Sequence, residues 1–406
     1  MDDPQRIVMQ DSIVTGLAAE SAAGPIYVTS TAGNTDSGVT QTTLSAIDLS
    51  GTERWHRVFD GTTAAPHVAG DGSIWLTHDG PDGATLVETS RDGRPSRTIA
   101  VTHHAGDKLG EVVLLPDGFC TAWTSGPPYQ GARVDRRDVD GSCIWSATIP
   151  PAQLAHRCVM AASEETGWRS LQKSPWVPGT FRLHYWEPLL VSGDRILASY
   201  VEGKSKLGIS YFLDLATGEI INSTTPAPVG HKAISGFGEF LIGVQGYDEF
   251  ATARYTRTGD EAVRWPTHGA IVIDRTGKFL GVEFDNRAAA QPRLRVMERD
   301  GSLSDGPVLV GHNTGYPALD RDGTAVFWKK GGLATIDAGL EIHELFSGED
   351  DSSPYLSRIL LLEDGIVAVG LTGDLLLFRT ELAPLEDSVW PCGDGNLNGN
   401  PVVSAQ

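Results

Sequence analysis

The chain has 406 residues, with 47 glycines, 23 prolines and only 4 methionines, and this composition favours many short strands joined by tight turns over a helix-rich protein. Its formal net charge of −20 argues against a nucleic-acid-binding protein and against binding to an anionic membrane surface, because both depend on Lys and Arg. A charge of this sign favours a cationic ligand, or serves only solubility.

One pattern recurs along the chain and predicts the fold. Each copy has an apolar segment, a turn that ends in Gly, two further strands separated from each other by a loop, another Gly turn and a short fourth strand. The steps between successive copies are about 40 to 50 residues with one exception, which is typical of a four-stranded propeller blade. In chain order, the first turns are Ala23-Gly24, Asp71-Gly72, Asp117-Gly118, Ser192-Gly193, Phe237-Gly238, Thr276-Gly277, Asp322-Gly323 and Asp364-Gly365.

In the first copy the expected strands cover residues 13–19, 26–30 and 43–48, followed by a strand around Trp55. The third copy repeats this with residues 112–115, 119–123, 132–136 and 144–145. The sequence therefore predicts an all-β fold, a single closed β-propeller domain over residues 1–406 with eight blades of four antiparallel strands, or seven blades as the alternative count. Either end of the chain could complete the last blade, which would place the two termini side by side.

The one longer step lies between the third and fourth blades. Residues 150–182 are predicted to form an insertion there, lying over one face of the propeller. Loops that exceed their repeat often serve a functional site, although a decorative insertion is an equal alternative.

Two copies share the form Asp-x-x-Gly-x-x-x-Trp, in Asp48-Leu-Ser-Gly-Thr-Glu-Arg-Trp55 and in Asp138-Val-Asp-Gly-Ser-Cys-Ile-Trp145. This motif resembles the repeats of the pyrroloquinoline-quinone-like (quinoprotein-like) β-propeller superfamily. The resemblance implies the propeller fold, with the repeated Trp side chains packing between blades. Quinone-dependent members commonly use an adjacent cysteine pair against the cofactor, and the four cysteines of this chain are scattered. We therefore expect no cofactor.

The innermost strands of a propeller line its central channel, so equivalent positions on these strands should converge at the channel mouth. Convergent polar groups at such a mouth are the usual form of a small-molecule site, although they can also face water without a function. The positions six residues before each first turn are Leu17, Ala65, Glu111, Trp186, His231, Ala270, Tyr316 and Arg358.

Five of these positions carry functional groups. If the protein is an enzyme, Glu111, His231, Arg358 and Tyr316 are the candidate catalytic residues, with acid, base and anion-holding roles for the first three. The aromatic side chains of Trp186 and Tyr316 could form flat walls of the site at the channel mouth. The predicted ligand-binding residues are Trp186, Glu187, His67, His268 and Lys232.

The sequence predicts no metal site. Asp394-Gly-Asn396-Leu-Asn398-Gly399 matches the opening of a calcium loop, but Ala405 stands where a closing Glu should be. The cysteines form no CxxC pair, which suits a reducing compartment. The chain shows neither a secretory signal nor an apolar run of membrane-spanning length, so we expect a cytoplasmic protein.

These observations predict a ligand- or partner-binding propeller with its site at the channel mouth. The expected partner is a small molecule or peptide in the central channel, or a protein on one face, with neither nucleic acid nor membrane. The alternative is a cofactor-independent enzyme, a lyase, isomerase or cyclase, acting in the same mouth. A quinone-dependent oxidoreductase is a third, weaker alternative.

Overall fold

The structure is a computed structural model and describes residues 3–33, 40–80, 83–101, 107–125, 131–150, 181–183, 187–202, 207–245, 250–283, 292–309, 316–329, 331–348 and 358–403. Most of the predicted insertion (residues 151–180) and Trp186 lie outside these ranges. Phe181 and Arg182, which the prediction placed in the insertion, instead belong to strand β14 (Phe181–Leu183).

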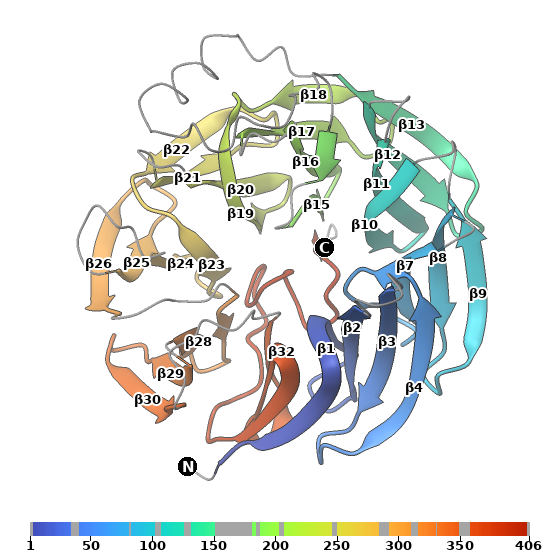
Figure 1. Cartoon of the computed structure of the whole chain (residues 1–406). Helices are drawn as coiled ribbons and strands as arrows, with labels where there is room; N and C mark the ends of the chain where they lie inside the picture. The colour runs from blue at the N-terminus through green and yellow to red at the C-terminus, as the bar shows by residue number, and fades with distance from the viewer. Residues whose placement is uncertain are drawn as a thin grey trace, which may run out of the picture.

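Antiparallel sheets stand radially around a central axis, as in a propeller (Figure 1). Among the described residues, seven sheets with four strand positions each are built from consecutive strands. The first three consist of β1 (Gln5–Ala19), β2 (Ile26–Gly33), β3 (Thr40–Ile47) and β4 (Glu53–Asp60); β5 (Thr62–Thr63) with β6 (His67–Val68), β7 (Ile74–Gly80), β8 (Gly83–Thr89) and β9 (Pro95–Ala100); and β10 (Asp107–Leu115), β11 (Gly118–Ser125), β12 (Gly131–Asp138) and β13 (Cys143–Ile149).

The next four sheets follow the same plan. They consist of β14 with β15 (Leu189–Ser192), β16 (Arg195–Glu202), β17 (Leu207–Asp214) and β18 (Ile220–Ser223); β19 (Ala227–Gly236), β20 (Glu239–Gln245), β21 (Phe250–Tyr255) and β22 (Glu261–Trp265); β23 (Gly269–Ile273), β24 (Phe279–Glu283), β25 (Arg293–Met297) and β26 (Leu303–Val308); and β27 (Ala318–Leu319), β28 (Ala325–Lys329), β29 (Gly332–Ile336) and β30 (Ile342–Phe346). In the second and fourth sheets the innermost position is occupied by two short strands that pair with the same neighbour.

The ring is closed by a composite sheet that joins the two ends of the chain. It contains β31 (Ile359–Leu361) and β32 (Ile366–Arg379), which follow the short 3-10 helix η1 (Glu363–Gly365). Residues 367–369 of β32 pair with β31, and residues 374–377 pair with residues 5–8 of β1. Residues 12–19 of β1 then begin the first sheet by pairing with β2.

The predicted count of eight blades is therefore wrong, and the alternative count of seven agrees with the sheets of the described residues. Seven four-stranded sheets are contiguous in sequence, and the last predicted unit is completed by the N-terminal residues. The prediction that the two termini lie side by side is also wrong. The start of β1 lies at the outer rim, whereas β33 (Val402–Val403) lies near the axis and pairs in parallel with β15 (Figure 1).

Strands at inner positions are apolar on both faces because each sheet packs against a neighbour on either side. Every residue of β15 and of β23 is buried. One hydrophobic cluster joins Phe212 of β17, Phe240 of β20, Trp265 of β22 and Phe279 of β24, which belong to three successive sheets. Within the described part of the chain, no helix is long and apolar enough to cross a membrane.

The Asp-x-x-Gly part of the repeat forms the turn between the third and fourth strands of a sheet. The Asp48 Oδ1 atom accepts hydrogen bonds from the backbone N–H groups of Ser50 at 2.9 Å and Thr52 at 3.0 Å. Gly51 has φ +83°, a conformation that residues with a side chain rarely adopt. The motif is therefore explained by the local geometry of a tight turn.

The repeated Trp joins each sheet to the next. Trp55 Nε1 donates a hydrogen bond to the backbone carbonyl of Arg91 at 2.8 Å, in the following sheet. Its ring lies so close to Gly93 that a Cβ atom there would be 2.6 Å from Trp55 Cδ2. Trp145 makes the same pair of contacts with Leu215 and Gly218. The predicted packing of these two Trp side chains between blades is confirmed.

We expect Trp55→Ala and Gly93→Ala each to lower the free energy of unfolding by about 2–4 kcal/mol. The first change removes the ring and its hydrogen bond, and the second adds a methyl group where the ring lies and where φ is +83°. Chemical denaturation measures both effects. Arg54→Ala, on the same strand but exposed, is the control and should change stability by less than about 0.5 kcal/mol. Equal losses in all three variants would contradict the proposed docking of Trp55.

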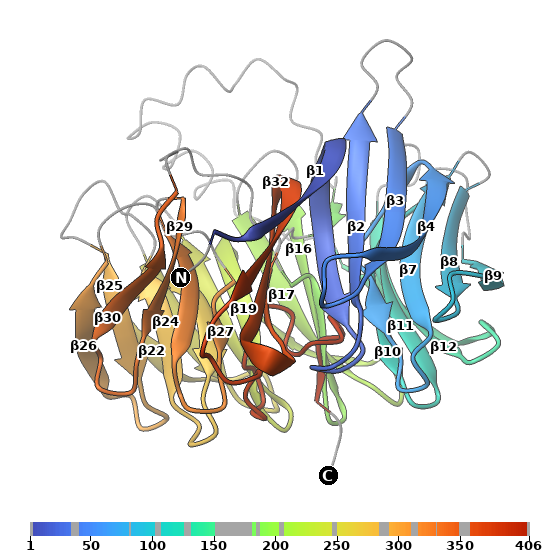
Figure 2. The same cartoon turned by 90° about the horizontal axis from the view of Figure 1, so that it is seen from below.

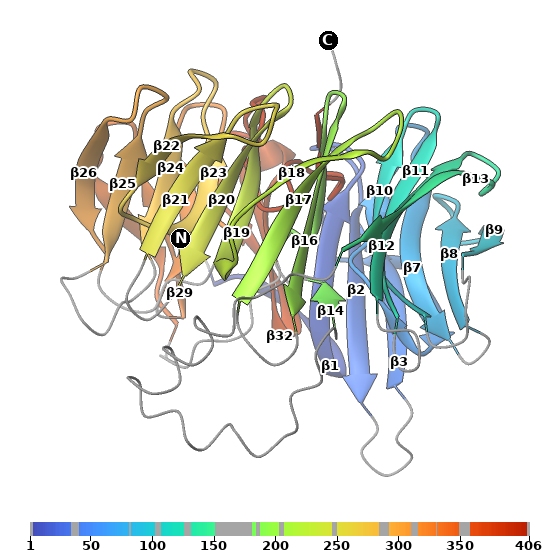
Figure 3. The same cartoon turned by 90° about the horizontal axis from the view of Figure 1, so that it is seen from above.

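The residues that follow β32 form a strap across one end of the channel. We call residues 381–403 the C-terminal strap. Its backbone forms hydrogen bonds with the innermost strands of six different sheets, at Leu361, Ala19, Val68, Val191, Ile273 and Leu319. It reaches a seventh sheet through the side chain of Asn400, which accepts from the backbone N–H of Leu114 and donates to the Leu114 carbonyl. Edge-on views place the strap on one face of the ring (Figures 2 and 3). That end of the channel is therefore closed by the chain itself.

Candidate functional site

Seven ionisable side chains meet around the axis above the strap, and we call them the channel cluster. Six come from the innermost strands of five different sheets or from the residues just before those strands, and one comes from the strap. Five are buried, and Glu111 and Asp394 are partly exposed. The cluster consists of His67, Glu111, Glu187, His231, Lys232, Arg358 and Asp394.

His67 and Glu111 form a buried ion pair. His67 Nδ1 donates to the backbone carbonyl of Gly399, and His67 Nε2 lies 3.0 Å from Glu111 Oε1. Because both partners are acceptors, both ring nitrogens carry a proton. Burial disfavours this imidazolium, but the hydrogen bond and charge of Glu111 together with the Gly399 carbonyl raise the pKa of His67. These contacts favour the imidazolium form of His67, and they hold the ring between β10 and the strap.

Glu187 connects the fourth sheet to the fifth. Its Oε1 atom lies 3.1 Å from His231 Nδ1, and its Oε2 atom accepts the backbone N–H of Lys232 at 3.0 Å. Burial opposes the charge of Glu187, but His231 and Lys232 outweigh it and lower the pKa of this carboxyl. Glu187 has φ +36°, a strained conformation for a residue with a side chain. The strain is maintained by these contacts.

Lys232 is 2% exposed, and its Nζ atom donates to the backbone carbonyl of Gly230 at 3.2 Å. Burial lowers the pKa of Lys232 to about 8, and the charge of Glu187 opposes this shift. At neutral pH the ammonium is therefore present and is balanced by Glu187.

Arg358 fixes the strap to the ring. Its Nη1 atom donates to the backbone carbonyl of Leu17 at 2.9 Å, and its Nη2 atom donates to the carbonyl of Asn396 and contacts Cys392 Sγ at 3.2 Å. Its Nε atom lies 3.7 Å from Asp394 Oδ2. Arg358 is 1% exposed, so the guanidinium serves mainly contacts within the chain.

Asp394 brings the separate pairs into one electrostatic group. Burial raises the pKa of Asp394 to about 6; the charge of Arg358 opposes this shift, while the charges of Glu187 and Glu111 add to it. A carboxyl that titrates near neutral pH is typical of functional sites. Asp394 therefore links the His67–Glu111 pair, Glu187 and Arg358.

Asp394→Asn is expected to change the dependence of stability on pH. The folded-state pKa of about 6 lies above the ordinary value of 3.8, so between about pH 4 and pH 6 the folded protein keeps a proton that the unfolded chain has released. This contribution to stability is lost as pH rises through that window. We compare the free energy of unfolding of Asp394→Asn with that of the unmodified chain at both pH values. Allowing for the partial exposure of Asp394, this difference should shift in favour of the variant by on the order of 1–2 kcal/mol between pH 4 and pH 7. Denaturation at both pH values tests this, and an unchanged slope would contradict the raised pKa.

Two further predicted residues lie beside the cluster. His268 is buried, and its Nε2 atom accepts the backbone N–H of His231 at 3.2 Å. Tyr316 is half-buried, and its ring meets the His231 ring edge-on with centroids 5.2 Å apart. The structure therefore brings His67, Glu111, Glu187, His231, Lys232 and Arg358 together, with His268 and Tyr316 in contact with His231.

Sequence reasoning missed the strap as part of this site. The sequence feature that lies in the strap is the calcium-loop-like pattern from Asp394 to Gly399. Its Asn side chains form hydrogen bonds within the protein instead of facing a metal ion. Asn398 Nδ2 donates to the carbonyls of Ala19 and Glu20, and Asn396 Oδ1 accepts the N–H of Asn400. These amides complete the hydrogen bonding of strand ends and of the strap itself.

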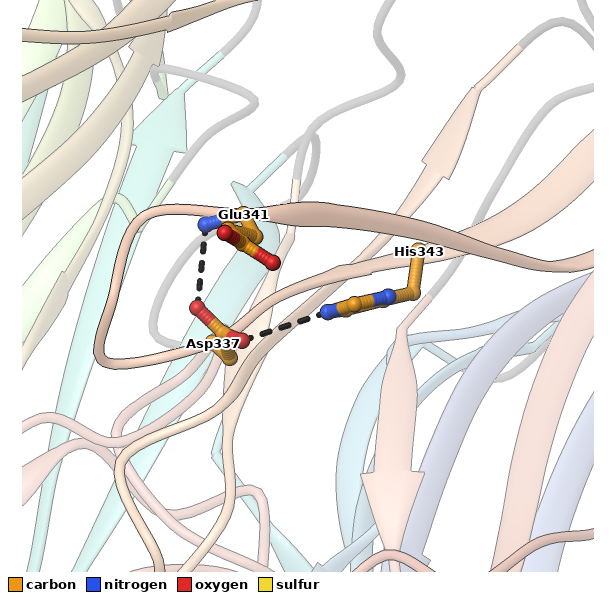
Figure 4. A group of neighbouring side chains, drawn as sticks. All are labelled: Asp337, Glu341 and His343. Carbon is orange, nitrogen blue, oxygen red and sulfur yellow. Dashed lines mark hydrogen bonds and ion pairs between the residues drawn. The ribbon is translucent and has the colours of Figure 1, made fainter.

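One group of potential metal ligands among the described residues lies near the surface. Asp337, Glu341 and His343 have ligand atoms within 4.8 Å of one another, on the turn between β29 and β30 and at the start of β30 (Figure 4). Asp337 Oδ1 accepts the N–H of Glu341 at 2.9 Å, and Oδ2 lies 3.2 Å from His343 Nε2. The same Asp-to-turn hydrogen bond occurs at Asp48, so turn geometry explains this group.

Several solved structures are distantly similar to this chain. No protein-family model and no curated protein matches the chain. A streptogramin B lyase structure has 12% identity and a TM-score of 0.46, covering 93% of this chain and 97% of that chain. A virginiamycin B lyase from Staphylococcus aureus has 11% identity and a TM-score of 0.48, covering 93% and 99%. The β-propeller domain of the trilobed protease from Pyrococcus furiosus has 12% identity and a TM-score of 0.44, covering 94% and 97%.

At these identities the similarity says nothing about activity. The chain is an all-β propeller, and its function has to be argued from the channel cluster.

Proposed function

We propose that this chain is a ligand-binding propeller and that the channel cluster binds the ligand. We also propose that it belongs to the pyrroloquinoline-quinone-like superfamily and acts in the cytoplasm on a small molecule or peptide. The Asp-x-x-Gly turns and the docking of Trp55 and Trp145 support the superfamily.

The observation that carries this proposal is the convergence of charged groups from distant parts of the chain. Burying an ion costs several kcal/mol unless it is paired, and apolar side chains would fill a channel at lower cost. Here five buried ionisable groups surround two carboxyl groups that still reach solvent, with side-chain exposures of 19% for Glu111 and 28% for Asp394. A ligand would therefore meet these two carboxyl groups first.

The test uses the full chain and a library of polar metabolites and dipeptides. Binding to the folded state raises the melting temperature by mass action. We expect at least one compound to do so, and we expect Glu111→Gln to remove most of that shift while circular dichroism stays unchanged. Glu344→Gln, an exposed carboxylate on β30, is the matched control and should retain the shift. A library without any stabilising compound, or equal shifts in both variants, would contradict the proposal.

A cofactor-independent lyase, isomerase or cyclase is the second candidate, and the pKa of about 6 of Asp394 is the observation that favours it. A general acid or base works best with a pKa near the operating pH. In that case Asp394→Asn should abolish turnover even at a compound concentration that saturates the variant. A binding protein would show no turnover in either form.

A further inference from the structure

We infer that the ligand is a neutral hydroxylated molecule of the monosaccharide or polyol class, held between Arg358 and the carboxylates of Asp394 and Glu111. This inference rests on the proposed function and specifies the chemistry of its ligand. It departs from the cationic ligand that the net charge of the whole chain favours.

The first argument is the charge balance of the channel cluster. Three carboxyl groups, on Glu111, Glu187 and Asp394, face three basic groups, on His67, Lys232 and Arg358. The seventh member, His231, lies 3.1 Å from Glu187 and is 3% exposed, so it contacts a carboxylate that is already within the cluster. An ammonium group at Asp394 would lie beside the Arg358 guanidinium, and a carboxylate there would lie beside three groups of its own sign. A neutral molecule avoids both repulsions, so the local balance favours it.

The second argument is an unused donor of Arg358. Among the described residues, Arg358 Nε has no hydrogen-bond partner although it is buried. Its separation of 3.7 Å from Asp394 Oδ2 is an ion-pair distance and is too long for a hydrogen bond. A buried donor without an acceptor costs about 1–3 kcal/mol, so this position favours an incoming acceptor atom.

A hydroxyl group is the ligand group that satisfies both neighbours at once. Its oxygen accepts from Arg358 Nε, and its proton is donated to Asp394 Oδ2. An ammonium group cannot accept, and an ionised carboxylate cannot donate. Two such atoms that lie too far apart to bond directly are commonly bridged by an oxygen atom in this way.

Glu111 provides a second acceptor for the same molecule. Its Oε1 atom lies 3.0 Å from His67 Nε2, and His67 Nδ1 donates to the carbonyl of Gly399 in the strap, which also carries Asp394. The charge of Glu111 contributes to the raised pKa of Asp394, in agreement with this placement. The half-buried Tyr316 ring packs against Gly393 of the strap, next to Asp394. A molecule with several hydroxyl groups on one apolar frame can bond both carboxylates and lie against that ring.

The experiment measures binding to the full-length protein by ligand-observed NMR and calorimetry at fixed ionic strength. The probes are glucose, galactose and myo-inositol, with ethylammonium, acetate and glycylglycine as comparison arms. We expect a hydroxylated probe to bind, and we expect Asp394→Asn and Glu111→Gln each to weaken it at least tenfold. Arg358→Lys keeps the charge but removes Nε, and it should weaken binding similarly where the variant folds. Glu344→Gln should bind like the unmodified chain.

The outcomes separate this inference from the proposed function. Binding of ethylammonium, acetate or glycylglycine that depends on Glu111, without binding of the hydroxylated probes, would overturn the ligand class and leave the binding function standing. Sugar binding that is unchanged in Asp394→Asn and Glu111→Gln would overturn the inference, because the molecule would then lie elsewhere. No binding in any arm would overturn the inference, and the metabolite library would then decide the binding function separately.

Discussion

Glu187→Gln is expected to lower the free energy of unfolding by about 3 kcal/mol at pH 7. The change removes the charge that balances Lys232, which is 2% exposed. Removing one partner of a buried ion pair leaves an uncompensated charge, and this typically costs 3–5 kcal/mol. The side-chain amide of Gln keeps one oxygen that can accept the Lys232 backbone N–H. The expected loss of stability therefore lies at the lower end of this range. Guanidinium denaturation measures the loss.

A double-variant cycle distinguishes charge balance from general disruption of the fold. Lys232→Met removes the cation, so Glu187→Gln combined with Lys232→Met should lose clearly less stability than the two single variants added together. Glu344→Gln is again the exposed control and should stay within about 0.5 kcal/mol of the unmodified chain. Strictly additive losses would mean that Glu187 and Lys232 are not energetically coupled.

The second large effect is expected when most of the C-terminal strap, from residue 387 onward, is removed. A chain that ends at Glu386 loses the backbone hydrogen bonds to Ala19, Val68, Val191 and Ile273, and both bonds between Asn400 and Leu114. At about 1 kcal/mol net for each bond, the loss reaches on the order of 6 kcal/mol, which is comparable to the whole stability of many proteins. We therefore expect no cooperative thermal transition for this truncated chain.

Point variants keep this prediction testable if the truncated chain fails to accumulate. Asn400→Ala removes both side-chain bonds to Leu114 and should cost about 1–3 kcal/mol. Asp387→Ala, an exposed position on the same strap, is the control and should have little effect. A stable Asn400→Ala variant together with a truncated chain that melts like the full chain would show that the strap does not hold the ring.

The fold was predictable from sequence because its signals are local. A Gly turn and an Asp side chain that accepts turn N–H groups, as at Asp48 and Gly51, act within four residues. The predicted count of eight blades was wrong because the last predicted unit is completed by a distant segment, as in the pairing of Gln5 with Leu377. No repeat pattern encodes such a contact.

The candidate site was predictable in part for the same reason. Equivalent positions in successive repeats converge on the axis, so counting back from the turns found Glu111, His231 and Arg358. Asp394 was not found as part of the site, because the strap lies outside the repeat and its path across the channel has no periodic signal. Its Asp-Gly-Asn letters indicated a turn but gave no information about what the turn contacts.

The composite closing sheet also has a consequence for biosynthesis. Residues 5–8 are translated more than 360 residues before their partners at residues 374–377. Residues 5–8 therefore remain unpaired at that edge until residues 374–377 have been translated, and the ring can be sealed only afterwards. Pairing across so long a stretch of chain is intrinsically slow. During this interval the exposed strand edge can pair with another chain and cause self-association. The risk ends when residues 5–8 pair with residues 374–377.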